Sequence, residues 1–205
     1  GTAANRVAAK YPECSLASTD PREGGAVHRL DRGTSGVLIF ARSADVHATL
    51  RESFGSGEVS KSYYALTRAL PKRTPISEPL AQRGPRVVVA DDGLSATTDW
   101  RSLVHHDDYQ LLECRTRTGR MHQIRAHLGF SGAGIVGDET YGGPAGPKPL
   151  EHFFLHARSV TLESPSAGPI TISAPLPEDR RATLDALGFV GYDDELERRE
   201  SDAQE

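Results

Sequence analysis

The middle of the chain constrains the fold most, because its residues alternate as they do in β-strands and are separated by tight turns. In the segment KSYYALTRAL (residues 61–70), Tyr63 and Tyr64 fall on opposite sides of a predicted strand. Three further strand candidates, joined by DDG and HDD turns, are RVVVA (86–90), SATTDWRSLVHH (95–106) and YQLLECRTRT (109–118). Strands connected by such short turns pair antiparallel, so this region predicts a mainly antiparallel sheet.

Helical and further strand patterns lie on both sides of this region. Helices are predicted at residues 2–10, 43–57, 121–132 and 177–189. Further strands are predicted at GVLIF (36–40), FFLHARSVTLE (153–163) and ITISA (170–174), and GDETYGGPAGPKP (137–149) is predicted to be a loop. The fold class that this order favours is α+β, a mixed and mainly antiparallel sheet flanked by helices and loops.

Length and cysteine content exclude several classes of protein. The 205 residues suffice for one domain with a buried core, or at most for two small ones. Cys14 and Cys114 lie a hundred residues apart and form no CxxC pair, which is typical of a protein of the reducing cytoplasm. No apolar run approaches 18 residues, so we expect no membrane span and no signal peptide. The expected molecule is a cytoplasmic monomer.

Charge is unevenly distributed along a chain whose formal net charge is −4. Residues 178–205 hold ten acids and four arginines, a net charge of −6, so the preceding residues carry +2. Residues 115–127 (RTRTGRMHQIRAH) hold four arginines, two histidines and no acid. The acidic end predicts a solvated, disordered tail, and the basic segment indicates an anionic ligand.

A carboxylate stands between two arginines just ahead of the strand predicted at residues 36–40. In HRLDRGTSG (28–36), Asp31 is flanked by Arg29 and Arg32. Guanidinium groups beside a carboxylate keep it ionised and in place. Two interpretations follow: a salt bridge at the end of a strand, or an anionic nucleophile or base inside a cationic groove.

Metal binding is not indicated by the histidines of the basic segment. His122 and His127 are five residues apart on a predicted helix, so they do not share a face. We therefore expect no metal site there.

Four segments together resemble the RluA-type RNA pseudouridine synthases in content, order and spacing. They are HRLDRGTSG (28–36), KSYYAL (61–66), RTGRMHQIRAHL followed by IVGDETYGG (117–128 and 135–143), and FLHA (154–157). The combination is highly specific, and the resemblance covers roughly residues 3–176. It implies a catalytic fold with an active-site cleft and an enzyme that isomerises uridine in RNA to pseudouridine. Such an internal rearrangement requires no cofactor and no metal.

The resemblance implies catalytic roles for three residues. Asp31 matches the family aspartate, which attacks the ribose or supports a glycal-type intermediate. Arg120 matches the arginine that pairs with this aspartate, with phosphate binding as the alternative role. Tyr63 matches the tyrosine that stacks on the target uracil and takes the carbon 5 proton; Tyr64, or a purely structural Tyr63, is the alternative.

The resemblance also implies a set of substrate-binding residues. The target base must flip out of its stack, and His28 and Arg29 are placed to fill the vacated position or to contact neighbouring nucleotides. Leu155 is expected to form a wall of the uracil pocket. Phosphate contacts are expected from Arg115, Arg117 and Arg125. The remaining expected contacts are Arg32, Thr34, His122 and Gln123.

The predicted domain organisation is a catalytic domain over residues 1–189 and an acidic tail over residues 190–205. The family's N-terminal strand, with its Lys-Pro motif, and a separate N-terminal RNA-binding domain have no counterpart in this sequence. We expect the RNA to be large-subunit ribosomal RNA, or otherwise transfer RNA. The second hypothesis is an RNA-binding protein of the same fold with impaired catalysis.

Overall fold

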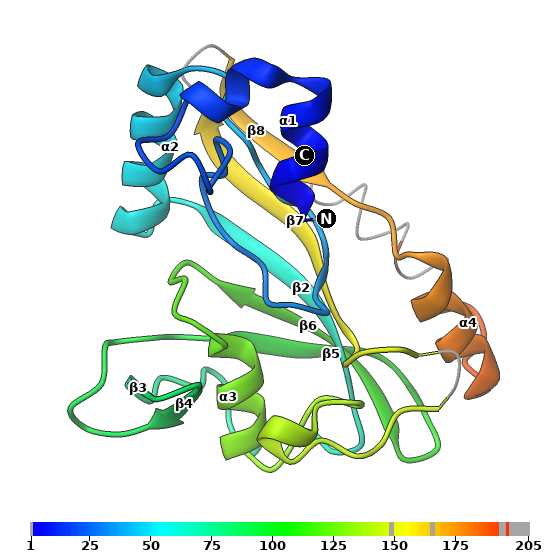
Figure 1. Cartoon of the computed structure of the whole chain (residues 1–205). Coiled ribbons are helices and arrows are strands. Elements are labelled where there is room, and N and C mark those ends of the chain that lie inside the picture. Colours follow the sequence, from blue (N-terminus) through cyan, green and yellow to red (C-terminus); the bar gives the residue numbers. More distant parts are fainter. Residues whose placement is uncertain (1, 148–149, 165–166, 193–195, 197–205) are drawn as a thin grey trace.

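The computed structural model describes residues 2–147, 150–164, 167–192 and 196. These residues form a six-stranded sheet, a separate two-stranded hairpin, and helices on both sides of the large sheet (Figure 1). The large sheet has the strand order β1-β7-β2-β6-β5, and β8 also pairs with β7. Its strands are β1 (Ser35–Gly36), β2 (Ser60–Thr67), β5 (Asp99–His106), β6 (Tyr109–Thr116), β7 (Leu155–Ser164) and β8 (Gly168–Ser173).

All of these strand pairs are antiparallel except β1 with β7, so the predicted mixed, mainly antiparallel sheet is confirmed. The separate hairpin consists of β3 (Leu80–Arg83) and β4 (Arg86–Val89). It lies beside α3, at the opposite end of the molecule from α1 and α2 (Figure 1).

Four α-helices occur among the described residues: α1 (Ala3–Lys10), α2 (Ala44–Ser56), α3 (Gln123–Phe130) and α4 (Glu178–Ala186). Two short 3-10 helices are η1 (Pro12–Leu16) and η2 (Glu139–Tyr141). Local chemistry sets the helix ends: Thr2 Oγ1 accepts a hydrogen bond from Asn5 N at 3.2 Å, and Gly57, with φ of +84°, ends α2. Helices α3 and α4 lie on opposite sides of the sheet (Figure 1).

Alternation along β2 and β6 divides their side chains between two faces of the sheet. Lys61 and Tyr63, with their partners Thr116 and Cys114, lie on one face, which we call the pocket face. The other face, which we call the reverse face, carries the intervening residues, among them Ser62, Tyr64, Glu113 and Arg115. Tyr63 and Tyr64 thus point to opposite sides, as predicted.

The hydrophobic core fills both sides of the sheet. Leu112 and Leu128 are fully buried between the sheet and α3, and Leu184 of α4 is fully buried on the other side. The same cluster continues to Tyr192 and Leu196, which are 4% and 5% exposed. The tail predicted from residue 190 therefore begins too early, because apolar residues beyond that point are packed. Residues 193–195 and 197–205 lie outside the described part of the chain.

Three local predictions are wrong. Only Ser35–Gly36 joins the sheet in the region predicted as strand 36–40, because Gly36 lies so close to β7 that a Cβ there would meet Ala157 O at 2.1 Å. The chain then leaves the ladder, and Phe40 makes an isolated bridge with Ala26. Strand β3 was not predicted, and the loop predicted at 137–149 contains η2.

Candidate active site

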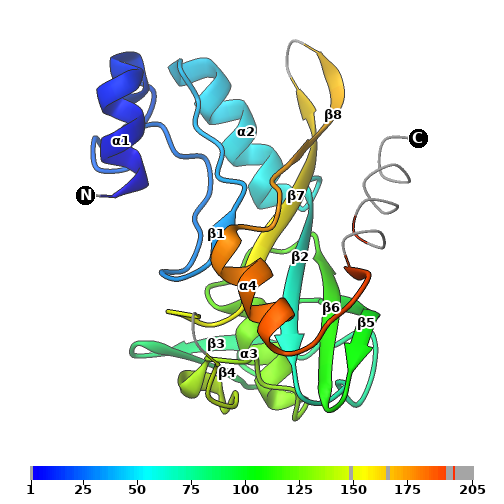
Figure 2. The same cartoon turned by 90° about the vertical axis from the view of Figure 1, so that its right-hand side faces the viewer.

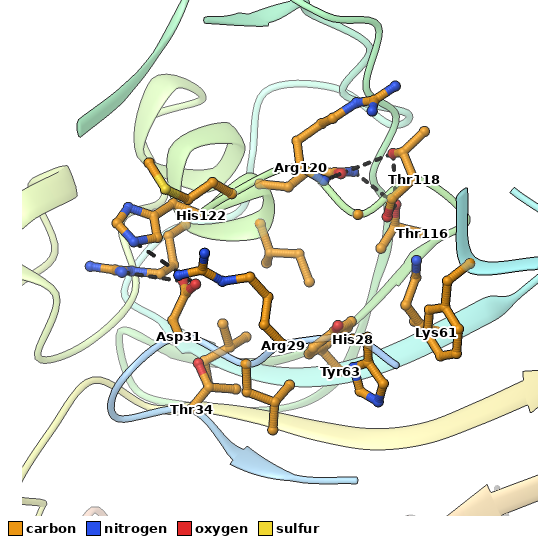
Figure 3. A pocket seen from close by; sticks show the side chains of 18 of the residues that line it. His28, Arg29, Asp31, Thr34, Lys61, Tyr63, Thr116, Thr118, Arg120 and His122 are labelled. Carbon is orange, nitrogen blue, oxygen red and sulfur yellow. Dashed lines mark hydrogen bonds and ion pairs between the residues drawn. The ribbon is translucent and has the colours of Figure 1, made fainter. Parts of the chain in front are cut away.

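A pocket of about 330 Å³ opens on the pocket face of the sheet (Figure 3). Five parts of the chain surround it: the HRLD loop (residues 28–31) ahead of β1, the end of α2, the pocket-face residues of β2, the segment from Thr116 into α3, and Leu155 of β7. Ten of the thirteen residues expected at the site line it. They are His28, Arg29, Asp31, Thr34, Tyr63, Arg120, His122, Gln123, Arg125 and Leu155.

Asp31 forms its closest ion pair with Arg125. Arg125 Nη1 donates to Asp31 Oδ2 at 3.2 Å, and the two side chains are only 8% and 13% exposed. The other side of the same guanidinium is held by Asp138, which accepts from Nε at 2.6 Å and from Nη2 at 2.9 Å. One arginine is thus fixed between two carboxylates, and its only hydrogen bond to the pocket side goes to Asp31.

Aromatic rings fix the plane of this guanidinium. The Arg125 guanidinium carbon lies 4.2 Å from the ring centre of Phe153 and 5.0 Å from that of Tyr141. The Asp138 carboxylate behind it belongs to a residue that is 2% exposed. This arrangement leaves Arg125 no freedom to follow a mobile ligand.

Two predicted roles are therefore wrong. Arg120 does not pair with Asp31: its Nε donates to Ser95 O at 3.1 Å, and its side chain is exposed at the edge of the pocket. Arg125 is not an exposed phosphate ligand, because it is buried between carboxylates. The reason is local, since α3 begins only at Gln123 and its first turn directs Arg125 toward Asp31.

His122 is the second cationic or hydrogen-bonding group near Asp31, with His122 Nε2 3.8 Å from Asp31 Oδ1 (Figure 3). Its backbone is left-handed, with φ of +52°, which is uncommon for a residue with a side chain. His122 Nδ1 lies 2.8 Å from Tyr141 Oη, which also accepts from Val87 N. Burial lowers the pKa of His122, although Asp31 opposes this, so the ring is neutral at pH 7.

Tyr63 lies in the pocket beside Leu155, which is buried on the neighbouring strand β7. Burial raises the pKa of the Tyr63 hydroxyl, and the nearby negative charge of Asp31 raises it further. The phenol therefore stays protonated at neutral pH. Thr34 contributes a buried Oγ1 without a hydrogen-bond partner in the described chain.

Gln123 serves the structure of the site rather than its surface. Its Nε2 donates to Thr97 O at 2.9 Å and to Thr116 Oγ1 at 2.8 Å, and its Oε1 accepts from Thr118 Oγ1 at 2.9 Å. Oε1 also accepts from the backbone N of Arg120 at 3.1 Å. Because both ends of the amide are occupied, Gln123 fixes the loop ahead of α3, and the expected substrate contact does not follow from its geometry.

Three residues expected to bind substrate do not line the pocket. Arg115 lies on the reverse face, where its Nε donates to Glu113 Oε1 at 3.1 Å. Arg117 is exposed beyond the end of β6, and Arg32, the residue after Asp31, is exposed. Of the four arginines of the basic segment, Arg120 and Arg125 therefore line the pocket, and Arg115 and Arg117 do not.

His28 lines the pocket but is fixed by the fold. Its ring stacks on Phe54 with ring centres 4.6 Å apart, and its Nε2 accepts from Ile39 N at 3.1 Å. Burial, together with the positive charge of Lys61, lowers the pKa of His28 to about 4. His28 is therefore a neutral wall of the pocket at pH 7.

Arg180 of α4 supports the site from behind. This residue is 5% exposed, and its Nη2 donates to Gly33 O at 2.8 Å and to Phe153 O at 3.3 Å. One side chain thus holds both the loop of Asp31 and the residue whose ring lies against Arg125.

Several pocket residues were not predicted: Arg51, Phe54, Lys61, Thr116 and Thr118. Asp138, which lies behind Arg125, was not predicted either. Strand alternation could have found Lys61, which is two residues ahead of Tyr63 and so on the same face. No such signal marks Asp138, which meets Arg125 only through the fold. In the described part of the chain, no cluster of His, Cys, Asp and Glu could hold a metal ion, and no helix could span a membrane.

Comparison with known proteins agrees with this geometry. Residues 2–129 match the family model for RNA pseudouridylate synthases. An uncharacterized RNA pseudouridine synthase of Chloroflexus aurantiacus is 38% identical over 192 residues, which cover 91% of this chain and 60% of the relative. The large-subunit pseudouridine synthase D of Xanthomonas campestris is 35% identical over 204 residues, again covering 91% of this chain and 60% of the relative.

The solved structure of human RNA pseudouridylate synthase domain containing 4 superposes with a TM-score of 0.66 at 25% identity, covering 79% of this chain and 75% of that one. The chain thus spans about 60% of the Chloroflexus and Xanthomonas relatives and shares the fold of the human domain. By its motifs, its matching family model and its structure, the chain belongs to the RluA-type RNA pseudouridine synthase family.

Proposed function

We propose that this protein is an RNA pseudouridine synthase, with Asp31 as its catalytic carboxylate. The observation that carries the proposal is the position of Asp31, held at the pocket by Arg125 and approached by His122. A salt bridge alone would satisfy one arginine with one carboxylate. Here Asp138 already provides Arg125 with two short hydrogen bonds, so Asp31 is not needed to neutralise it.

The isomerisation breaks the N1–C1′ bond of uridine, joins C5 to C1′ and moves the C5 proton, so the product has the composition of the substrate. Asp31 either attacks the sugar or supports a glycal-type intermediate, and both routes require a negative charge beside the ribose. Arg125 positions that carboxylate through the ion pair at 3.2 Å, and the His122 ring lies beside it. An amide in place of the Asp31 carboxylate would not supply the negative charge that both routes require.

Tyr63 would lie against the uracil that has left its stack and entered the pocket. Because its hydroxyl stays protonated, it can relay the C5 proton only by giving up its own in the same step, and it does not act as a standing phenolate base. Leu155 would close the apolar side of the base site. Arg29 and Arg120 at the open side would contact the surrounding RNA.

We propose large-subunit ribosomal RNA as the substrate. Support comes from the Xanthomonas relative, whose name states that RNA, and the same name is carried by relatives from Haemophilus influenzae and Yersinia pestis. Transfer RNA is the other outcome. We also propose that the protein is a cytoplasmic monomer, as the sequence predicts.

The deciding experiment is tritium release from RNA labelled at carbon 5 of uridine, combined with mapping of pseudouridines in total RNA with and without the gene. We expect release by the wild type, none by Asp31→Asn, and a missing pseudouridine in ribosomal RNA. RNA binding without tritium release by the wild type would favour the impaired RNA-binding protein. A modification lost from transfer RNA would keep the enzyme and change its substrate.

A further inference from the structure

The charges of the pocket are balanced around Asp31 and unbalanced elsewhere. Among the residues that the structure describes, Asp31 is the only carboxylate that lines it, and Arg125 is its partner. Four other cations line the same pocket and form no ion pair with a carboxylate of the described chain: Arg29, Arg51, Lys61 and Arg120. Figure 3 shows Lys61 on the opposite side of the view from Asp31, with Tyr63 between them. Arg29 reaches toward Asp31 in the same view, so the cationic side that the described residues of the pocket leave without a counter-charge is the side of Lys61 and Arg120.

Lys61 is the unusual member of this group because it is buried. The residue is 5% exposed, yet within the described part of the chain its ammonium has a single hydrogen bond, from Nζ to the carbonyl oxygen of Arg117 at 3.1 Å. The aromatic face of Phe54, 5.7 Å from Nζ, is the other favourable contact. Burial and the charge of Arg120 lower the pKa of Lys61 to about 8.

A buried ammonium without a carboxylate partner destabilises the folded protein, since the charge has lost water and gained little in return. The fold does not need a charge at this position: a methionine side chain would fill similar space between Phe54 and β6. Lys61 also keeps two of its three N–H donors free. A residue with these properties at a pocket is suited to an anion that arrives from outside.

We propose that Lys61 binds a backbone phosphate of the RNA, adjacent to the nucleotide whose base enters the pocket. The proposal rests on the proposed function, which supplies the polyanionic ligand. Lys61 lies two residues ahead of Tyr63 on β2 and on the same face. A nucleotide whose base stacks on Tyr63 therefore brings its phosphodiester linkage to the side of the pocket on which Lys61 lies. Arg51 and Arg120 add positive charge around the same phosphate.

The test compares Lys61→Met and Lys61→Arg with the wild type, and uses Lys10→Met as a matched control on the exposed helix α1. The probe is a short single-stranded oligouridylate, bound at several salt concentrations between about 50 and 200 mM. We expect Lys61→Met to weaken binding about tenfold or more at low salt. The slope of log affinity against log salt should fall by about 0.7, the value for one phosphate of a single strand.

The matched variants and the melting temperature separate binding from stability. Lys61→Arg should stay within about threefold of the wild type and Lys10→Met within about twofold, because each phosphate contact adds independently. Lys61→Met should melt at the same temperature as the wild type or higher, since it removes an unpaired buried charge.

Three results would overturn the proposal: an unchanged salt slope in Lys61→Met, a lower melting temperature of that variant, or no salt-dependent binding by the wild type. A weaker Lys61→Met with the wild-type slope would mean that Lys61 contacts a base. Tritium release by the wild type is measured in parallel. If release occurs and the slope is unchanged, only the phosphate site fails; if the slope changes and no RNA is isomerised, only the proposed enzyme fails.

Discussion

The two faces of the central sheet treat their arginines and lysines in opposite ways. On the reverse face, the buried carboxylate of Glu113 binds both Arg101 and Arg115, and accepts a further hydrogen bond from Ser62 Oγ at 2.9 Å. On the pocket face, Lys61 has no carboxylate partner in the described chain. Neighbouring residues of one strand therefore serve different purposes: the reverse face neutralises its charges within the protein, and the pocket face keeps them for a ligand.

The largest effect on activity is expected for Asp31, the pocket carboxylate that forms an ion pair with Arg125. Asp31→Asn should lower pseudouridine formation about a thousandfold or more, roughly 4 kcal/mol of barrier, because the amide keeps the shape but loses the charge needed beside the sugar. RNA binding should hold or increase, since a repulsive charge is removed. Single-turnover assays and binding measurements on the same RNA decide it. Turnover within about tenfold of the wild type would remove Asp31 from the catalytic role.

The next largest effect concerns the arginine shared by two carboxylates. Arg125→Met should reduce the free energy of unfolding by about 3–5 kcal/mol, because it leaves buried Asp138 unpaired. It should also inactivate the protein, since Asp31 loses its nearest partner.

Urea unfolding and turnover of Arg125→Met are compared with the double variant Arg125→Met/Asp138→Asn. The double variant should regain stability but not activity, because Asp31 still lacks the arginine that positions its carboxylate. Recovery of both would show that Arg125 acts only by stabilising the fold.

A smaller effect appears in acid and involves one histidine on each face. Burial lowers the pKa of His28, on the pocket face, and of His156, on the reverse face, to about 4 in the folded protein. The unfolded chain binds their protons near pH 6.5, so stability is present above that pH and is lost as pH falls from about 6.5 toward 4, by up to about 3 kcal/mol per histidine.

Urea unfolding at pH 7 and pH 4.5 measures this loss. His156→Asn should reduce the loss by up to about half, because His28 still titrates, as do His122 and His127, whose pKa values burial also lowers, and should leave RNA binding unaltered. If His156→Asn loses as much stability between pH 7 and pH 4.5 as the wild type, other titratable groups cause the loss.

The smallest effect compares two arginines of the basic segment. Arg120→Met should weaken RNA binding about three- to tenfold, the contribution of one phosphate contact at moderate salt. Arg115→Met should change it less than about twofold, because Arg115 lies on the reverse face and is bound by Glu113. Binding isotherms at one salt concentration suffice. Equal losses in both variants would show that RNA also reaches the reverse face and would break the division between the two faces.

Much of the fold was predictable because its strands have local patterns. Alternation predicted β2, β5, β6 and β7, and helical spacing predicted all four described α-helices to within a few residues. Strand β1 could not be predicted in this way. Its extent depends on how closely Gly36 approaches β7, which lies more than a hundred residues further along the chain.

The site was predictable in its members but not in their pairing. Motif resemblance placed Asp31 and Tyr63 in one pocket, yet assigned Arg120 the contact that Arg125 makes. The difference arises at His122, whose left-handed backbone ends the preceding loop, so that α3 begins at Gln123, two residues after the predicted start. Strand alternation puts Arg115 and Thr116 on opposite faces of the sheet, but it does not indicate which face bears the pocket. Only the packing of α3 decides that.

The hydrogen bond from Arg180 to Gly33 affects the order in which the parts of the molecule fold as the chain is synthesised. It joins residues 147 positions apart, and a chain is synthesised from its N-terminus. Contacts at such a separation form late, after the entropy of closing the long intervening loop has been overcome. The HRLD loop therefore leaves the ribosome long before the helix that anchors it. We expect that the loop of Asp31 lacks this support until α4 has docked, and that chains ending before α4 carry the motif on a loop that is less firmly held.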